Sequence, residues 1–288
     1  MKLSIIVLSY NTRALTVNCF KSIGEIYKSS LGEKIELILS DNASEDKTSE
    51  AVESLKLRVK IVKNDKNLGF SKGNNQGVKK AIGRYLFFLN SDTEIKDDGI
   101  LRMVDFMEKN SKVGILGAKL LNKDGSSQKS AGSFYNLFQT LLSLLGLERL
   151  GLVKKSPKET EKVDWVSGAA LMIRADLFRK LRGFDEKIFM YMEDVDLCFR
   201  ANEIGFKTYF YPNINLIHRE HGSSNRAFAI NQIYQGLLYF YRKHKPYWQY
   251  FAVKGLLIGK ALIAVTIGGL MNNNYLKKTY GQALRLAI

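Results

Sequence analysis

Four short apolar runs alternate with amphipathic segments over the first third of the chain, and this order constrains the fold more than any other feature of the sequence. The runs are apolar at nearly every position, which is typical of parallel strands that are covered on both faces. Amphipathic stretches of helical length separate them, as in repeated strand-helix-strand units. We therefore predict an α/β fold with a doubly wound, mostly parallel central sheet flanked by helices. The expected strands are residues 3–8, 35–40, 59–63 and 85–89, and the expected helices are residues 14–23, 48–55 and 74–82.

Clusters of polar residues follow the expected strands. Asn, Asp, Ser and Gly are common in turns and helix caps, so any single cluster has an ordinary structural explanation. Parallel strands, however, end at one edge of the sheet, where open α/β sheets bind their ligands. Four clusters in succession on that edge favour a binding site. They are residues 9–11, 41–46, 64–75 and 90–92.

Two acidic clusters lie about a hundred residues apart in the sequence. The first follows the fourth expected strand and contains Asp92, and the second contains Glu193, Asp194 and Asp196. A salt-bridged helix start exposed to solvent would explain the second cluster, but the apolar residues at 189–192 argue against a freely solvated face. Carboxylates can bind a divalent cation or accept a proton. Together the clusters predict a metal-and-base site for a phosphorylated donor.

The length of 288 residues allows one large domain or one domain with an appendage. Cys19 and Cys198 lack partners at metal-ligand spacing, so the sequence predicts neither a disulfide framework nor a zinc site and fits a reducing compartment. Residues 1–8 are too short for the apolar core of a signal peptide, and we interpret them as the first strand.

The net charge of +16 is unusual and unevenly distributed. No Asp or Glu follows Glu220, whereas nine Lys and Arg residues do, so the last quarter of the chain is strongly basic. Such a charge indicates an acidic partner, which nucleic acid, anionic lipid or a phosphorylated small molecule would provide. No nucleic-acid-binding motif accompanies the charge, so we predict no nucleic acid partner. The basic residues are Arg226, Arg242, Lys243, Lys245, Lys254, Lys260, Lys277, Lys278 and Arg285.

The basic tail also contains an aromatic cluster at residues 247–251 and a long apolar stretch up to residue 270. A membrane-spanning helix needs about 20 apolar residues with few charges, and Lys254 and Lys260 make a span doubtful. An amphipathic helix that lies in the membrane interface fits the lysines and aromatic residues better. The alternative is an apolar helix packed on the rest of the protein. We expect residues 226–288 to form a helical, membrane-associating extension at the cytoplasmic face of the cell membrane, peripheral or monotopic.

Eight segments in this order resemble glycosyltransferase family 2, the inverting nucleotide-sugar enzymes of GT-A fold, and within it the rhamnosyltransferase-like branch that builds bacterial cell-surface polysaccharides. Each segment alone is weakly specific, whereas the ordered set is highly specific. The resemblance runs from about residue 3 to residue 221 and implies a nucleotide-sugar transferase domain at residues 1–225. The segments are residues 4–11, 41–46, 67–75, 88–92, 165–170, 183–185 and 193–200, together with His218.

The resemblance assigns the nucleotide to the edge of the sheet. Asp41 would accept a hydrogen bond from the base, and Ser9, Tyr10 and Asn11 would line the same pocket. Uracil and thymine present a ring N–H between two carbonyls, which suits a carboxylate with amide donors nearby. As an alternative, Asp41 caps a helix that begins near Ser44.

The metal signature of the family is D-x-D. Asp92 matches its last acid, whereas Asn90 stands at the position of the first. The resemblance implies that Asp92 binds Mg²⁺ or Mn²⁺, with His218, the donor diphosphate and water completing the shell. Further donor or metal contacts are implied for Lys72, Asn74, Ser91, Arg219, His221 and Arg226.

The second acidic cluster matches the catalytic base of the family. Asp194 would remove the proton of the acceptor hydroxyl, and Glu193 would position the acceptor or the loop. Asp196 and Arg200, four residues apart on an expected helix, would form a structural pair. Trp165 is either a buried core residue or a platform for the sugar or the acceptor.

The resemblance therefore implies an inverting glycosyltransferase that moves a sugar, with rhamnose as the first candidate, from a dTDP- or UDP-sugar to a hydroxyl of a lipid-linked or polysaccharide acceptor. The alternative is a non-catalytic, membrane-docked scaffold that keeps a degenerate GT-A fold. The missing first acid of the metal signature favours that alternative.

Overall fold

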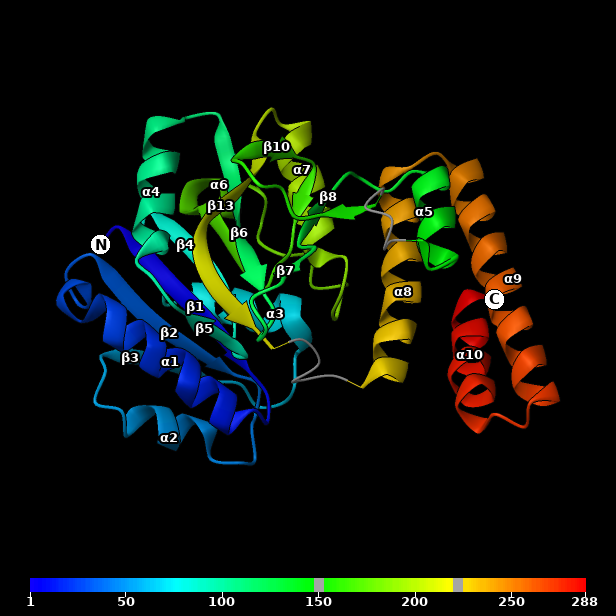
Figure 1. Cartoon of the computed structure of the whole chain (residues 1–288), viewed down its shortest axis with the longest axis horizontal. Coiled ribbons are helices and arrows are strands. Elements are labelled where there is room, and N and C mark those ends of the chain that lie inside the picture. The colour runs from blue at the N-terminus through cyan, green and yellow to red at the C-terminus, as the bar shows by residue number, and fades with distance from the viewer. Residues whose placement is uncertain (148–152, 220–224) are drawn as a thin grey trace.

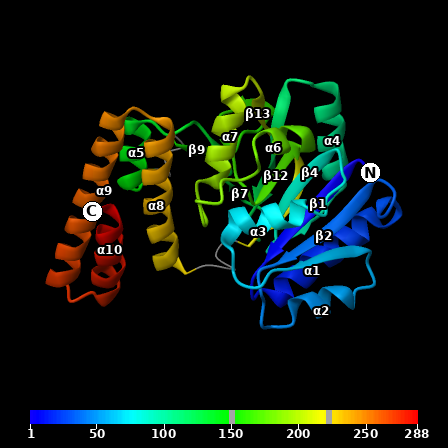
Figure 2. The same ribbon diagram turned by 180° about the vertical axis from the view of Figure 1, so that it is seen from behind.

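The computed structural model describes residues 1–147, 153–219 and 225–288. An α/β part contains the N-terminus, and the C-terminal helices lie beside it as a separate helical layer (Figure 1). The view from behind shows the same separation, with the C-terminus in the helical layer (Figure 2).

The four strands predicted for the first third of the chain form a parallel half of the main sheet, in the order β3-β2-β1-β4. β1 pairs with β2 on one side and with β4 on the other, so the direction of strand addition reverses at β1. In open α/β sheets such a reversal creates a crevice at the carboxyl ends of the strands. These strands are β1 (Leu3–Ser9), β2 (Ile35–Asp41), β3 (Val59–Lys63) and β4 (Tyr85–Asn90).

The other half of the main sheet is mixed. β12 (Ala170–Arg174) lies between β4 and β6 (Val113–Leu121) and runs antiparallel to both, while β13 (Lys207–His218) runs parallel to β6. Along the order of the main sheet most pairings are parallel, as predicted. The remaining strands of this sheet are β5 (Thr93–Ile95), β7 (Ser127–Gln128) and β10 (Glu161–Val163), and a small second sheet contains β8 (Ala131–Gly132), β9 (Lys154–Lys155) and β11 (Trp165–Val166).

Helices cover both faces of the main sheet, as a doubly wound arrangement requires. Along β1, Ile5 and Val7 join an apolar cluster with α1 and α4, whereas Ile6 joins a second cluster on the other face with α6 and α7. All three side chains are buried, which explains why the strand is apolar throughout. The helices of this part are α1 (Arg13–Tyr27), α2 (Thr48–Glu53), α3 (Gly69–Val78), α4 (Gly99–Lys109), α6 (Ala175–Lys180) and α7 (Glu193–Glu203), with a 3-10 turn at Lys28–Ser30.

The helical layer shares its core with the α/β part. Leu237 and Phe240 of α8 are buried in the same apolar cluster as Phe88 of β4 and Leu197 of α7. Among the described residues, α9 alone is long and apolar enough to cross a membrane, by length and composition only. A core helix of a soluble protein passes the same test. The side chains that α9 exposes must therefore distinguish a packed helix from one that contacts a membrane. The layer consists of α5 (Leu137–Leu144), α8 (Arg226–His244), α9 (Tyr247–Leu270) and α10 (Asn274–Ala287).

Candidate active site

A buried hydroxyl network joins the carboxyl ends of β1 and β4. Ser9 ends β1, Ser91 follows β4, and the Oγ1 of Thr12 lies 3.0 Å from the Oγ of each. All three side chains are buried. The network fixes the turn that precedes Asp92 against the start of α1, so these two predicted serines shape the floor of the site through contacts within the protein.

Asp41 ends β2 and supports the loop that follows. One carboxylate oxygen accepts a hydrogen bond from the Ser44 N–H at 2.9 Å, and the other accepts one from the Ser49 hydroxyl. The next helix begins at Thr48, so Asp41 supports a turn and does not cap a helix near Ser44. Each oxygen keeps a second lone pair, which could accept the ring N–H of a base.

The loop after β1 contacts the loop after β2. Asn11 has a left-handed φ of 51°; its N–H donates to the Ser44 Oγ at 2.9 Å, and its Oδ1 accepts from the Glu45 N–H at 2.8 Å. The Tyr10 side chain is exposed beside it. The residues predicted to line a nucleoside pocket thus lie on two loops that hold each other at the edge of the sheet.

The two predicted metal ligands lie together. Asp92 follows β4 and His218 ends β13, and the His218 Nε2 lies 3.3 Å from the Asp92 Oδ1. On its other side the His218 Nδ1 lies 2.8 Å from the Gln128 Oε1, so a proton on Nδ1 would leave the Nε2 lone pair directed at the site. The parts of the chain that the structure describes contain no group of three or more His, Cys, Asp or Glu able to hold a metal ion. A cation here would take two protein ligands and complete its shell with phosphate oxygens and water, which Mg²⁺ commonly does.

Arg219 borders this pair. Its backbone N–H donates to the Asp92 carbonyl at 3.0 Å, and its guanidinium pairs with Glu94. The Arg219 Nε is buried and has no hydrogen-bond partner within the described chain. Arg226 lies apart in the first turn of α8, and the described part of the chain shows no hydrogen bond or ion pair between it and the Asp92–His218 pair. His221 lies outside the described residues.

Two carboxylates begin α7. The Asp194 Oδ2 accepts the Gly168 N–H at 3.0 Å, and the Oδ1 accepts the Val195 N–H at 2.8 Å. Burial raises the pKa of Asp194 above its usual range, and these two backbone donors oppose the shift. Burial together with the negative charge of Asp194 raises the pKa of Glu193 well above its usual range. Asp194 is therefore expected to ionise before Glu193 as the pH rises.

One turn, residues 167–169, contacts both acidic clusters. The Gly168 N–H binds Asp194, and the Ala169 carbonyl accepts the Asn90 N–H at 2.9 Å, two residues before Asp92. Sequence reasoning noted this segment but gave Gly168 no role, because a backbone donor leaves no signal in residue type. The clusters that are distant in sequence therefore flank a single turn.

The backbone before α7 is strained. Tyr191 and Met192 have left-handed φ values of 67° and 76°. Such residues persist only where neighbouring groups fix them, and they occur often at functional sites. The carbonyl of Phe189 accepts the Phe70 N–H at 2.7 Å, and Gly69, with φ 76°, leaves room for it: a Cβ there would lie 2.4 Å from that oxygen. The start of α3 thus holds the 185–192 loop, which precedes Glu193.

Three residues that were predicted to contact the donor or the acceptor make other interactions in this structure. The Lys72 Nζ lies 3.6 Å from the Glu186 Oε2. Asn74 is buried, and its amide donates to the carbonyl four residues earlier at 3.0 Å. Trp165 is also buried, and its indole N–H donates to the Ser133 carbonyl at 2.9 Å. Of the two alternatives for Trp165, the structure favours the core residue.

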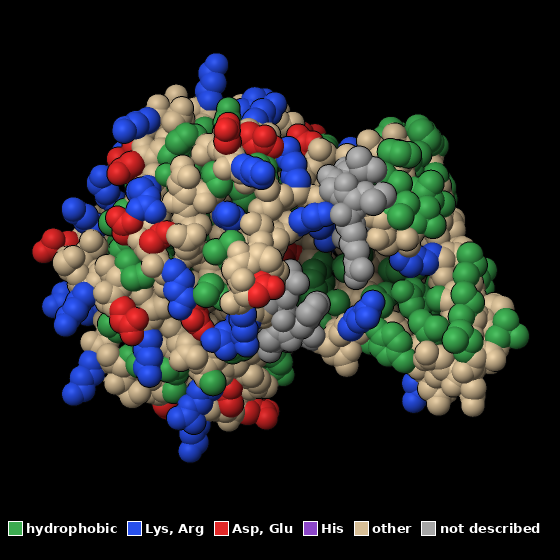
Figure 3. Space-filling view, viewed as in Figure 1, with side chains coloured by type: hydrophobic (Ala, Val, Ile, Leu, Met, Phe, Trp, Pro, Cys, Tyr) green, Lys and Arg blue, Asp and Glu red, His purple; other side chains and the backbone are tan. Residues whose placement is uncertain are grey.

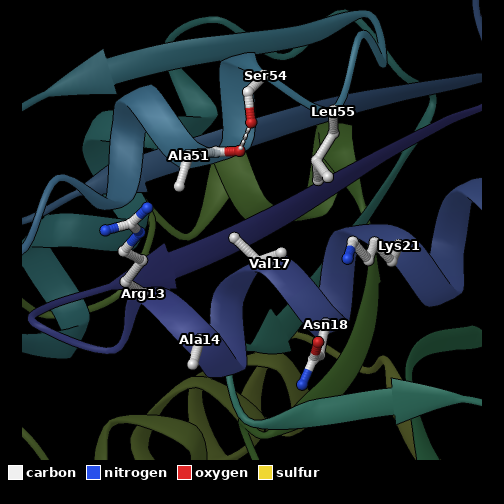
Figure 4. A pocket seen from close by; sticks show the side chains of 8 residues that line it. All are labelled: Arg13, Ala14, Val17, Asn18, Lys21, Ala51, Ser54 and Leu55. Carbon is white, nitrogen blue, oxygen red and sulfur yellow. Dashed lines mark hydrogen bonds between the residues drawn. The ribbon is translucent and has the colours of Figure 1, made fainter.

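A separate pocket lies between α1 and α2, lined by side chains such as Arg13 and Lys21 (Figure 4). None of the predicted site residues lines it. The candidate site is instead the edge of β1 and β4. The turn at residues 167–169 bonds Asp194 and Asn90, and Asn90 lies two residues before Asp92, which pairs with His218.

Two solved structures share the fold. The Pyrobaculum calidifontis mannosyltransferase PcManGT, in complex with GDP-Man and Mn²⁺, superimposes with a TM-score of 0.59 at 16% identity over 99% of this chain and 85% of that one. GalNAc-T7 with UDP, GalNAc and Mn²⁺ superimposes with a TM-score of 0.60 at 16% identity over 82% of this chain and 47% of that one. These similarities confirm the predicted GT-A fold.

Two of the curated relatives are named rhamnosyltransferases. Rhamnosyltransferase WbbL of Escherichia coli K12 is 31% identical over 171 residues, which cover 56% of this chain and 64% of that protein. The N-acetylglucosaminyl-diphospho-decaprenol L-rhamnosyltransferase of Mycobacterium tuberculosis is 27% identical over 217 residues, which cover 67% of this chain and 69% of that protein. The match thus spans slightly less than two thirds of the E. coli protein. Residues 4–182, more than half of the chain, match the model of glycosyl transferase family 2, and the chain belongs to this family, in agreement with the predicted rhamnosyltransferase-like branch.

Proposed function

We propose that this chain transfers a sugar, with inversion, from a dTDP- or UDP-sugar to a hydroxyl of a lipid-linked or polysaccharide acceptor in cell-surface glycan synthesis. Rhamnose is the proposed sugar because both relatives are named rhamnosyltransferases, and one name includes a diphospho-decaprenol acceptor. The observation that carries the proposal is the turn at residues 167–169, which places Asp194 on one side and the segment leading to Asp92 on the other.

Asp194 is the proposed base. An acceptor hydroxyl becomes a good nucleophile when its proton is removed during attack, and a carboxylate with a raised pKa accepts that proton more readily than an exposed one. The N–H groups of Gly168 and Val195 fix its orientation. The activated oxygen would attack the anomeric carbon opposite the departing nucleotide, which inverts that carbon.

Asp92 and His218 are the proposed ligands of Mg²⁺ or Mn²⁺. Their side chains fit such an ion because a carboxylate oxygen and an imidazole nitrogen converge at 3.3 Å, and both GT-A neighbours were solved with Mn²⁺. When bound, the cation would neutralise charge on the leaving diphosphate. Arg219 adds positive charge beside Asp92, and Asp41 would accept the ring N–H of the base.

Thermal unfolding with a panel of nucleoside diphosphates, each with Mn²⁺, Mg²⁺ or a chelator, tests the donor site. A ligand that binds the native state raises stability by RT ln(1 + [L]/Kd). We expect a metal-dependent rise with uridine or thymidine diphosphate only. No rise in stability with any nucleotide would contradict the proposal and favour the non-catalytic scaffold. That alternative is supported by Asn90, which stands where the metal signature has its first acid.

We also propose that residues 226–288 extend the transferase domain of residues 1–225 and dock it on the cytoplasmic face of the membrane. Lys254 and Lys260 bond to neighbouring helices: their Nζ atoms donate to the backbone oxygens of Ile288 at 2.8 Å and Leu144 at 2.6 Å. The outward face of α9 is therefore free of charge, and apolar side chains gather on this side of the molecule (Figure 3). They are Trp248, Phe251, Leu262, Ile263, Ile267 and Leu270, with Phe138 and Leu145 beside α9.

A further inference from the structure

Helix α8 lies against the segment from Asp185 to Asp196, which carries the proposed catalytic pair Glu193 and Asp194. This segment also contains the two left-handed residues before Glu193. Their conformation is unfavourable in isolation, so neighbouring groups must fix it. The match to the family model ends at residue 182, before this segment and before α8.

Two contacts hold the loop itself. The Asp185 Oδ2 accepts the Tyr239 hydroxyl at 2.8 Å and the Lys243 Nζ at 2.7 Å. Further along, Gly236 lets α8 approach the strained backbone directly, because a Cβ there would lie 2.8 Å from the Tyr191 carbonyl oxygen. α8 therefore contacts the loop at its start and immediately before α7.

A third contact holds the first turn of α7. Asp196 is 0% exposed; its Oδ1 accepts Lys243 and His244, each at 2.7 Å, and its Oδ2 accepts Arg200 at 2.7 Å. Burial alone would raise the pKa of Asp196, but the bond from His244 and the charges of Arg200 and Lys243 lower it to about 2. Asp196 is thus an ionised anchor two residues after Asp194.

We propose that Tyr239, Lys243 and His244 of α8 are positioning residues for the transfer reaction, which hold the loop and the start of α7 so that Asp194 meets the acceptor hydroxyl. The inference rests on the proposed function of Asp194. Lys243 is central because it binds Asp185 and Asp196, one at each end of the segment. A displacement of about 1 Å at a catalytic group can lower the rate about 100-fold, so small movements of this segment matter.

The test compares Lys243→Met with Arg242→Met in the full chain. Arg242 is exposed, and the described structure shows no hydrogen bond or ion pair for it, so both variants lose one charge from the same turn but only one loses the contact. We expect Lys243→Met to lower kcat about tenfold or more, with nucleotide affinity unchanged, and Arg242→Met to keep the wild-type kcat. Hydrogen exchange should rise in the 185–192 loop of Lys243→Met but not in β4.

Conservative variants separate positioning from general stability. His244→Gln keeps a donor for Asp196 and His244→Leu does not, so the Gln variant should retain the higher kcat at a temperature where both are folded. If Lys243→Met does not fold, Tyr239→Phe provides the milder test, because Lys243 still binds Asp185 in that variant.

The outcomes distinguish this inference from the proposed function. The positioning role alone would be overturned if the wild type is active and Asp194→Asn is inactive, but folded Lys243→Met and Arg242→Met have equal kcat. Equal kcat for the two His244 variants would overturn it in the same way. A wild type that transfers no sugar and binds no nucleotide would overturn the proposed function, and this inference with it.

Discussion

The Glu193 and Asp194 side chains are chemically similar but differ in environment. Glu193 is 5% exposed, its Oε2 has no hydrogen-bond partner in the part of the chain described, and its pKa is raised more strongly than that of Asp194. Glu193 should therefore stay protonated when Asp194 acts as base. A glutamine is close in shape to a protonated glutamate.

We therefore predict that Glu193→Gln keeps most of the transfer rate, whereas Asp194→Asn lowers it at least 100-fold with donor binding intact. Because the pKa of Asp194 is raised, the rate should fall as the pH drops through a value above the usual aspartate range. This acidic limb should stay in place in Glu193→Gln. A pH series of kcat/KM checks it, and loss of transfer in the glutamine variant would mean that Glu193 acts as an ionised group.

Asp196 contributes a pH-dependent term to stability. Its folded pKa of about 2 lies below the unfolded value of 3.8, so the folded state binds the proton less readily. The stabilisation is complete above about pH 4 and is lost as the pH falls toward 2, and its size is about 2 kcal/mol. The difference in unfolding free energy between wild type and Asp196→Asn should shrink by about this amount over that range. Urea unfolding at a series of pH values measures it; a difference independent of pH would contradict the assignment.

The charged side chains of the candidate site were predicted from residue types together with the family resemblance, and their roles stay predictions. Asp92 and His218 could be selected because a carboxylate or an imidazole at a strand end indicates chemistry, whereas the role of Asp194 at the start of α7 is what the resemblance implies. Trp165 could not be assigned, since a core residue and a sugar platform need the same side chain. Gly168 and Gln128 gave no signal, because a backbone N–H and a second-layer amide act through geometry that only the fold provides.

The approach of α3 to the 185–192 loop depends on one glycine. Gly69→Ala is disfavoured for two reasons: the backbone φ at this position is positive, and the added Cβ would collide with the Phe189 carbonyl oxygen. Gly125 is a matched control, because its φ is 82° but nothing lies within 4 Å of an added Cβ. We predict that Gly125→Ala lowers the unfolding free energy by about 1 kcal/mol, and that Gly69→Ala costs at least about 1 kcal/mol more and slows transfer.

Chemical denaturation and initial rates of these two variants provide the measurement. Equal losses of stability would show that the left-handed backbone alone matters at Gly69. A Gly69→Ala protein with the wild-type rate would show that the loop does not depend on this approach.

At the scale of elements, the local hydrophobic pattern predicted the strands whose formation depends on that pattern. β1 to β4 appear where apolar runs predict them. β1, β2 and β4 are buried on both faces, whereas β3 lies at the edge of the sheet and is partly exposed. β12, which enters the sheet antiparallel between β4 and β6, could not be placed, since its neighbours are more than fifty residues away in sequence. The contact of α8 with α7 is equally non-local: the sequence predicts a membrane-associating tail, with a packed apolar helix as the alternative, but gives no packing partner for it.

For the whole molecule, the tail has two faces of different character. The inward face binds the segment that holds Asp194, and the outward face of α9 is apolar and uncharged. Removing the chain from Arg242 onward would therefore disturb the site and the surface together, since it deletes Lys243 and His244. Point substitutions on the outward face are needed to separate membrane binding from catalysis.

Ile263 and Ile82 provide such a pair, because they are 63% and 65% exposed but lie on α9 and on the α/β part. Moving an exposed isoleucine into lipid gains about 1.5–3 kcal/mol, so Ile263→Glu should weaken binding to anionic vesicles about tenfold or more. Ile82→Glu should bind like the wild type, and both variants should keep the wild-type Tm and the wild-type rate of transfer to a soluble acceptor.

Binding to anionic vesicles should also weaken at high salt, because basic side chains near an anionic surface each contribute about 1 kcal/mol. Co-sedimentation with vesicles with and without anionic lipid measures this; equal sedimentation of the two variants would mean that α9 does not face the membrane.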